Sequence, residues 1–382
     1  KIYHCQELAL VLRYLSFNIL IGSFGTIQTV LLTKSINFKQ QTKVSVLTTL
    51  VSGLFGVILA YLGFGVWSLV GQALLRSISY TTLMWLTYEW RPILKFSISS
   101  LSSMFKFGSM ILLNSLFKLI FQNIYTILIG IYYSPAMLGI YTRAKQTQQL
   151  PVDTIWAILG RVIFPVISKI KNDNERIVSA IKDISNNIAF FVFPFLIIGM
   201  MVSDELFIIV FGSAWKPSII YFKILCIGSI FYPLEYLKNN VLMAKGKTDV
   251  AFKINLIRNM LILITILIIN KYGIKMMLIF NALISYLFFI VSSLFIKKYI
   301  GYTLYKQIKD VLPFVLCTLL AALNIFLIQK FTQINSIFFL FIVKLAIGLV
   351  SYLMACYFLK IKTLFDNLSL LFNLFKRQRL TI

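Results

Sequence analysis

Residues 139–168 read GIYTRAKQTQQLPVDTIWAILGRVIFPVIS, a segment of membrane-spanning length that contains cations, amides and prolines. Apolar runs flank it on both sides, ILLNSLFKLIF at 111–121 and IAFFVFPFLIIGMM at 188–201. A helix that crosses the hydrocarbon core needs about 20 mostly apolar residues. The flanking runs fit membrane helices, so the polar segment between them needs an explanation that the rest of the chain must supply.

The composition is that of an integral membrane protein. Of 382 residues, 59% are hydrophobic and 13% are charged. A soluble domain would have about 45–50% apolar and about 25% charged residues. We therefore expect an all-α membrane protein with little mass outside the bilayer. Its candidate helices, about eleven in number, lie near 8–32, 44–62, 65–87, 107–133, 136–168, 177–202, 217–243, 250–270, 273–296, 310–329 and 335–360.

Membrane topology explains the net charge of +25 better than nucleic-acid binding does, because the cations are spread over short connections between apolar runs. Alternate connections differ in charge: one set is rich in lysine and arginine, and the other holds only Lys216, Lys271, Lys275 and Lys330. Basic connections favour the cytoplasm. The C-terminus is then expected in the cytoplasm and residue 1 outside, which an odd number of preceding helices would explain.

A weak internal repeat divides the chain. Residues 12–87 and 222–296 both run apolar helix, basic connection, apolar helix, glycine turn, apolar helix. Chance similarity between leucine-rich helices remains an alternative. Repeated halves are a feature of transporters. We expect three parts: residues 1–90 as the remainder of a first lobe that lacks its first three helices, 91–300 as a second lobe of six helices, and 301–382 as an appended helix pair with a basic tail.

The polar residues of 136–168 form a stripe if the segment is helical. Within about 40° of one line at 100° per residue lie Arg143, Gln146, Thr147, Thr154 and Arg161. Arg143 and Arg161 are roughly 27 Å apart along that helix. Lipid does not accept such a stripe, so the helix must be surrounded by protein or line a wet cavity. Simple hydrogen bonding between helices is the alternative.

Positive charge within the apolar runs exceeds negative charge. The cations are Arg13, Arg76, Lys118, Arg143, Lys145, Arg161, Lys223 and Lys344, against Asp153, Glu235 and, near the edge, Glu7. Unpaired cations at depth indicate an anionic ligand, and arginine suits phosphate oxygens. All of these cations except Lys344 are therefore candidate ligand-binding residues. Snorkelling towards the membrane surface is the alternative for Arg13 and Lys223.

Four further residues are candidates for motion or coupling. Pro151 and Pro165 each remove a helical hydrogen bond and could form hinges. Asp153 and Glu235 could couple transport to H⁺ or Na⁺. Local roles are the preferred interpretation of both carboxylates, with Glu235 paired to Lys238 and Asp153 capping a helix. With one histidine and no paired cysteine spacing, we expect no metal site, no cofactor and no catalytic motif.

Four segments together resemble a known family: GFGVWSLVGQ at 63–72, LGIYTRAKQTQQLPVD at 138–153, RVIFPVISKIKND at 161–173 and LFIIVFGSAWKPS at 206–218. They resemble bacterial oligosaccharide flippases of polysaccharide biosynthesis, the Wzx-like branch of the MOP superfamily. Tyr141, Arg143 and Ala144 match that family's tyrosine-x-arginine-alanine element, and Pro151 matches the proline that follows it. The combination is fairly specific, although each piece alone is weak.

The resemblance implies a MATE-like bundle of fourteen helices in two lobes around a cationic cavity. It also implies a substrate, an oligosaccharide on undecaprenyl diphosphate, that crosses the bacterial inner membrane for O-antigen, capsule or exopolysaccharide assembly. Partners would be membrane lipids and the polysaccharide polymerase and chain-length machinery. Two other functions remain open: a MATE-type drug exporter, which would need an acidic cavity, and a membrane polysaccharide polymerase or ligase, which would need catalytic residues on an outer loop.

Overall fold

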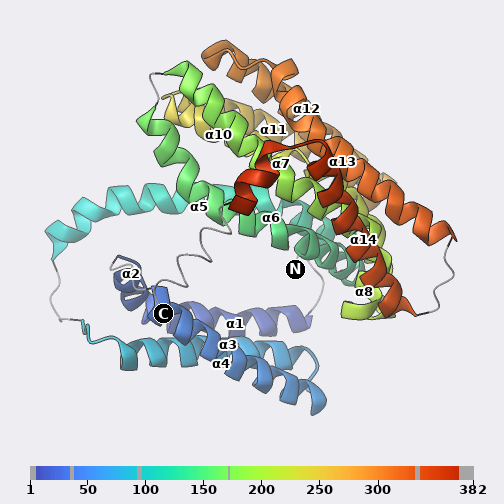
Figure 1. Ribbon diagram of the computed structural model, residues 1–382. Helices are drawn as coiled ribbons and strands as arrows, with labels where there is room; N and C mark the ends of the chain where they lie inside the picture. Colours follow the sequence, from blue (N-terminus) through green and yellow to red (C-terminus); the bar gives the residue numbers. More distant parts are fainter. Residues whose placement is uncertain (1–5, 35–37, 93–96, 171–172, 332–335, 370–382) are drawn as a thin grey trace, which may run out of the picture. The chain divides into compact units, whose positions relative to one another are not determined.

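The computed structural model describes residues 6–34, 38–92, 97–170, 173–331 and 336–369 (Figure 1), with only the backbone described for parts of α5 and α6. Packing divides the chain into two compact units, Lys1–Asn114 and Ser115–Ile382. The boundaries expected near residues 90 and 300 stay predictions. All regular structure in the described ranges is helical, which confirms the all-α fold class.

The first unit contains α1 (Gln6–Ser23), α2 (Thr26–Lys34), α3 (Phe38–Tyr61) and α4 (Val66–Thr87). The segment expected as one helix at 8–32 is broken, and its two parts meet at 51°. Side chains of α4 satisfy carbonyl groups near the break: Trp85 Nε1 donates to Phe24 O at 2.8 Å, and Thr81 Oγ1 donates to Ile21 O at 3.1 Å. The bend therefore costs few hydrogen bonds.

The second unit follows on α5 (Ile98–Tyr132), the helix that continues from one unit to the next. Its helices and 3₁₀ turns are α6 (Pro135–Lys169), α7 (Asn174–Met201), α8 (Ser203–Phe211), η1 (Ser213–Trp215), α9 (Ser218–Ser229), α10 (Tyr232–Ala244), α11 (Thr248–Ile269), η2 (Asn270–Tyr272), α12 (Ile274–Ile300), α13 (Leu304–Phe331) and α14 (Ile337–Phe358). In the described ranges each segment expected to be helical is largely helical, but 8–32 divides into α1 and α2, and 217–243 divides into α9 and α10. The short α8 lies where we expected only a connection.

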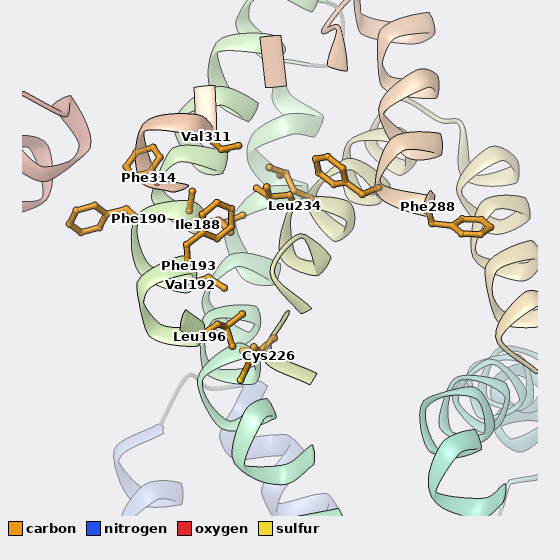
Figure 2. Packing of buried hydrophobic residues seen from close by; sticks show 14 of the residues in the cluster. Ile188, Phe190, Val192, Phe193, Leu196, Cys226, Leu234, Phe288, Val311 and Phe314 are labelled. Atoms are coloured by element: carbon orange, nitrogen blue, oxygen red, sulfur yellow. The ribbon is translucent and has the colours of Figure 1, made fainter. Parts of the chain in front are cut away.

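Helix α7 is the centre of the second unit's core. Its buried side chains Ile188, Phe193 and Leu196 gather with Leu234 of α10 and Cys226 of α9 (Figure 2). The rings of Phe190 and Phe314 lie 6.3 Å apart in edge contact, which joins α7 to α13. Burying these side chains favours helix association through close packing.

The expected appended pair, α13 and α14, belongs to the second unit and packs beside α7 (Figure 1). Tyr352 of α14 donates its hydroxyl hydrogen to Phe190 O at 2.9 Å. Seven helices of the described ranges have the length and hydropathy of a membrane span, or eight if α1 and α2 count as one. The protein is therefore a multi-pass membrane protein, while the expected total of eleven spans stays a prediction.

Candidate functional site

The start of α6 presents the motif YTRA. Ser134 caps the helix, its hydroxyl accepting from Met137 N at 3.3 Å, and Pro135 occupies the first turn, where its missing N–H costs nothing. Tyr141 and Ala144 are buried in the core, whereas Arg143 is half-buried. The helix therefore uses one face of the motif for packing and places the arginine at the boundary of the core.

Arg143 lies over two aromatic rings. Its guanidinium carbon is 4.7 Å from the ring centre of Phe211 and 4.9 Å from that of Trp215. Its Nε is buried without a hydrogen-bond partner, and no carboxylate in the described ranges forms an ion pair with it. Arg143 is thus a half-buried cation at the boundary of the core. Two aromatic rings attract its charge, and no carboxylate of the described ranges neutralises it.

Both rings come from the segment FGSAW that follows α8. Gly212 has φ 89° and ψ 169°, a conformation suited to glycine, and it turns the chain from α8 into η1. Trp215 N then donates to Gly212 O at 3.1 Å. Two of the four segments that carried the family resemblance, those containing YTRA and FGSAW, are therefore in direct contact through Arg143.

Two ion pairs hold the other end of α8. Asp204 Oδ2 accepts from Lys223 Nζ at 2.6 Å, and Glu205 Oε1 accepts from the buried Lys344 Nζ at 2.6 Å. Gln329 Oε1 accepts a further hydrogen bond from Lys344 at 3.1 Å. The expectation that Lys223 and Lys344 lack counter-charges is wrong, because α8 supplies a carboxylate to each. A ligand contact by Lys223 stays a prediction.

Glu235 is paired, but not with Lys238. Both of its carboxylate oxygens accept from Arg258 Nη1 at 2.9 Å, and the Glu235 side chain is 1% exposed. Lys238 instead donates to Ser293 Oγ at 2.5 Å and Phe289 O at 3.2 Å. The local pairing expected at i, i+3 is therefore wrong: α11 provides the counter-charge. A coupling role for Glu235 stays a prediction.

In the first unit, Arg76 lines an open hollow of mixed polar and apolar character. The hollow has a volume of about 650 Å³, and its lining also includes Asn18, Ser45, Gln72 and Tyr80. Asn18 Oδ1 is buried and has no partner within the described part of the chain. The exposed Arg13 lies on α1. Ligand contacts by Arg76 and Arg13 stay predictions.

The structure describes less of the surroundings of the remaining candidate residues. Lys145 is half-buried and has an interaction partner. The side chains of Lys118, Pro151, Asp153, Arg161 and Pro165 lie outside the described part of the structure, so the polar stripe is traced only over its first half. Helix α6 continues through residues 151 and 165, and the hinges expected there stay predictions.

Sequence reasoning missed three features of this site. Phe211 and Trp215 were considered only as part of the FGSAW motif, and their approach to Arg143 has no signal in the sequence. Arg258 was overlooked within an apolar run, where any arginine needs a partner. Glu205 was assigned to a connection, because the acidic start of α8 was not recognised as a helix start.

Comparison with known proteins gives one family and several relatives. A family model described as "Polysaccharide biosynthesis protein" matches residues 1–220. The teichuronic acid biosynthesis protein TuaB of Bacillus subtilis is 32% identical over 259 residues, which are 65% of this chain and 52% of that protein. The lipopolysaccharide biosynthesis protein WzxC of Escherichia coli is 26% identical over 205 residues, 52% of this chain and 42% of that protein.

The succinoglycan biosynthesis transport protein ExoT of Rhizobium meliloti is 22% identical over 210 residues, 55% of this chain and 42% of that protein. The chain spans about half the length of these curated relatives. A solved structure, lipid II flippase MurJ in an inward closed conformation, matches with a TM-score of 0.67 at 19% identity, over 92% of this chain and 74% of that one. At this identity the likeness concerns the fold.

Proposed function

Because the chain belongs to the polysaccharide biosynthesis protein family, as its motifs predicted, we propose that it is part of a flippase for a lipid-linked oligosaccharide. The substrate would carry a diphosphate on an undecaprenyl chain and would move by alternating access across the bacterial inner membrane. Its glycan would be destined for O-antigen, capsule or exopolysaccharide. The names of WzxC, ExoT and TuaB, and the MurJ-like fold, support this proposal.

The observation that carries the proposal is the state of Arg143. Three other cations of the second unit, Lys223, Lys344 and Arg258, are matched by carboxylates. Among the described residues, Arg143 lies over two rings and forms no ion pair, so its guanidinium is left able to bind oxygen anions. An arginine fork binds phosphate with charge-assisted hydrogen bonds. We propose the diphosphate of a carrier lipid as this anion, because its lipid chain holds the diphosphate at the membrane.

The expected orientation follows the charge of the connections. With basic connections in the cytoplasm, the C-terminus is cytoplasmic and Arg143, about 12 Å along α6 from its start, lies in the outer half of the membrane. Arg76, Lys145, Arg161 and Lys118 are proposed as further contacts along the path. We propose H⁺ or Na⁺ as the driving ion, with Asp153 as the stronger candidate because Arg258 occupies Glu235.

Drug export and glycan polymerisation are less well supported. A cavity for organic cations needs negative charge, whereas the cation of this site lacks a carboxylate neighbour in the described ranges. A polymerase needs a catalytic group on an outer loop, and the loop most suited to it contains α8, whose two carboxylates are engaged by lysines. Transport is therefore the function that the residues favour.

The proposal is tested in a strain that lacks the gene and is complemented with variants. Arg143→Ala should abolish most surface polysaccharide and cause lipid-linked oligosaccharide to accumulate on the cytoplasmic side of the membrane. The matched control is Arg176→Ala, which removes an exposed arginine paired with Asp173. Both proteins should be present at wild-type level in the membrane. Normal surface polysaccharide with Arg143→Ala would exclude a role for this arginine.

A further inference from the structure

The aromatic pair at Arg143 has properties that packing alone does not require. The guanidinium lies within 5 Å of both ring centres, and a second unrelated segment of the chain supplies both rings. No oxygen acceptor in the described ranges satisfies Arg143 Nε. A buried guanidinium is normally given a carboxylate, as Glu235 accepts from Arg258 Nη1, although Arg258 Nε is itself without a partner in the described ranges. The site around Arg143 is built with rings and without such oxygens.

Rings and carboxylates act differently on an arginine. A carboxylate neutralises the charge and occupies the N–H groups, which prevents the binding of another anion. An aromatic ring attracts the cation through its quadrupole, but it does not use up the guanidinium N–H groups as an oxygen acceptor would. Arg143 is thereby held in place while its hydrogen-bonding capacity is kept for a ligand. Rigid placement of a binding group lowers the entropic cost of binding.

The rings are themselves fixed. Phe211 packs against the buried Phe207, with ring centres 5.4 Å apart. The turn at Gly212 sets the direction of Trp215, and the ion pairs of Asp204 and Glu205 anchor the start of α8 on α9 and α14. The rings beside Arg143 therefore belong to a segment that is anchored by packing and by two ion pairs.

We infer that Phe211 and Trp215 are positioning residues that hold the Arg143 guanidinium, with its charge uncompensated, for the phosphate oxygens of the substrate. This inference rests on the proposed function and assigns a role to the FGSAW motif within it. The glycine at 212 separates the two rings so that both reach the same cation. The pair acts through Arg143 and has no separate contact with the ligand in this scheme.

The test measures equilibrium binding of farnesyl diphosphate to the purified chain in detergent micelles, with farnesol as the uncharged comparison. Trp215→Leu and Phe211→Leu should each weaken diphosphate binding about three- to tenfold, the range expected for one cation–π contact. Trp215→Phe keeps a ring and should recover most of the affinity. Farnesol binding should not change in any of these variants.

The matched control is Tyr272→Leu, which removes a ring from an exposed cation–π pair, Lys271 and Tyr272, at 5.6 Å. It should bind farnesyl diphosphate as the wild type does. Thermal unfolding of every variant separates a lost contact from a damaged fold. A double variant combines Trp215→Leu with Arg143→Ala. In this background, Trp215→Leu should not weaken diphosphate binding further.

The outcomes separate this inference from the proposed function. If Arg143→Ala loses diphosphate binding while both leucine variants bind like the wild type, the positioning role is refuted and the proposed function stands. If Trp215→Leu weakens binding by the same factor with and without Arg143, the ring acts independently and the inference is also refuted. If Arg143→Ala binds farnesyl diphosphate normally, the proposed function itself fails at this site.

Discussion

Two arginines of the second unit, Arg258 on α11 and Arg143 on α6, both lie near aromatic rings, but only Arg258 also has a carboxylate partner in the described ranges. Arg258 is bound by both carboxylate oxygens of Glu235 at 2.9 Å. Arg143 lies over Phe211 and Trp215, without a carboxylate among the described residues. The ion pair of Arg258 stabilises the packing of α10 and α11, whereas the ring contacts of Arg143 leave its charge available for a ligand. The partner of a buried cation, more than its depth, distinguishes structural from functional charge.

The largest effect is expected from breaking the Glu235–Arg258 pair. Glu235→Leu leaves a guanidinium that cannot lose its proton in the core, so the free energy of unfolding should fall by about 3–5 kcal/mol. Thermal unfolding in micelles measures it. Glu235→Leu combined with Arg258→Leu should recover much of the loss, since no charge is left unpaired. Equal stability of the single variant and the wild type would show that the pair contributes nothing.

An intermediate effect is expected at the buried Lys344. Lys344→Met leaves Glu205 without its ammonium partner, but a carboxylate can take up a proton, which limits the loss to about 2–3 kcal/mol. The same unfolding measurement applies, with Lys223→Met as the control for a half-exposed pair on α8, worth about 0–1 kcal/mol. A loss no larger than that of Lys223→Met would contradict the burial argument.

A smaller effect on stability than at Glu235 or Lys344 is expected at Arg143. Arg143→Ala leaves no carboxylate of the described ranges unpaired and removes two cation–π contacts, so the free energy of unfolding should fall by about 1–2 kcal/mol. Arg258→Ala, its counterpart, should cost more because Glu235 remains buried without a partner. Side-by-side unfolding curves decide the order. If Arg143→Ala were the more damaging change, the division between a structural and an available arginine would be wrong.

The sequence predicted the helices well because apolar runs of membrane length have few alternatives in lipid. It did not predict the bend between α1 and α2, because the compensating hydrogen bonds come from Thr81 and Trp85 of another helix. The short α8 was missed because its length, Ser203–Phe211, resembles a connection. The local hydropathy pattern therefore predicted the long helices, but it did not predict where a helix bends or where a short helix lies between them.

The candidate site was predicted in part. Arg143 was identified from its place in a polar stripe, but its rings were not, since they lie on a segment distant in the sequence. The charge partners were also missed: Lys344 and Glu205 are 139 residues apart, and Glu235 prefers an arginine 23 residues away to a lysine on its own helix. Pairings of this kind depend on tertiary packing, which periodicity does not encode.

The most direct test of an available Arg143 uses a chain that retains Trp215 as its single tryptophan, the other four of the five being replaced by phenylalanine. Its fluorescence is followed during titration with farnesyl diphosphate and, separately, with farnesol. An anion that engages the guanidinium 4.9 Å from the indole ring should change the emission saturably. The account predicts this change with the diphosphate alone and its loss with Arg143→Ala. The same change with farnesol, or its persistence without Arg143, would contradict the account.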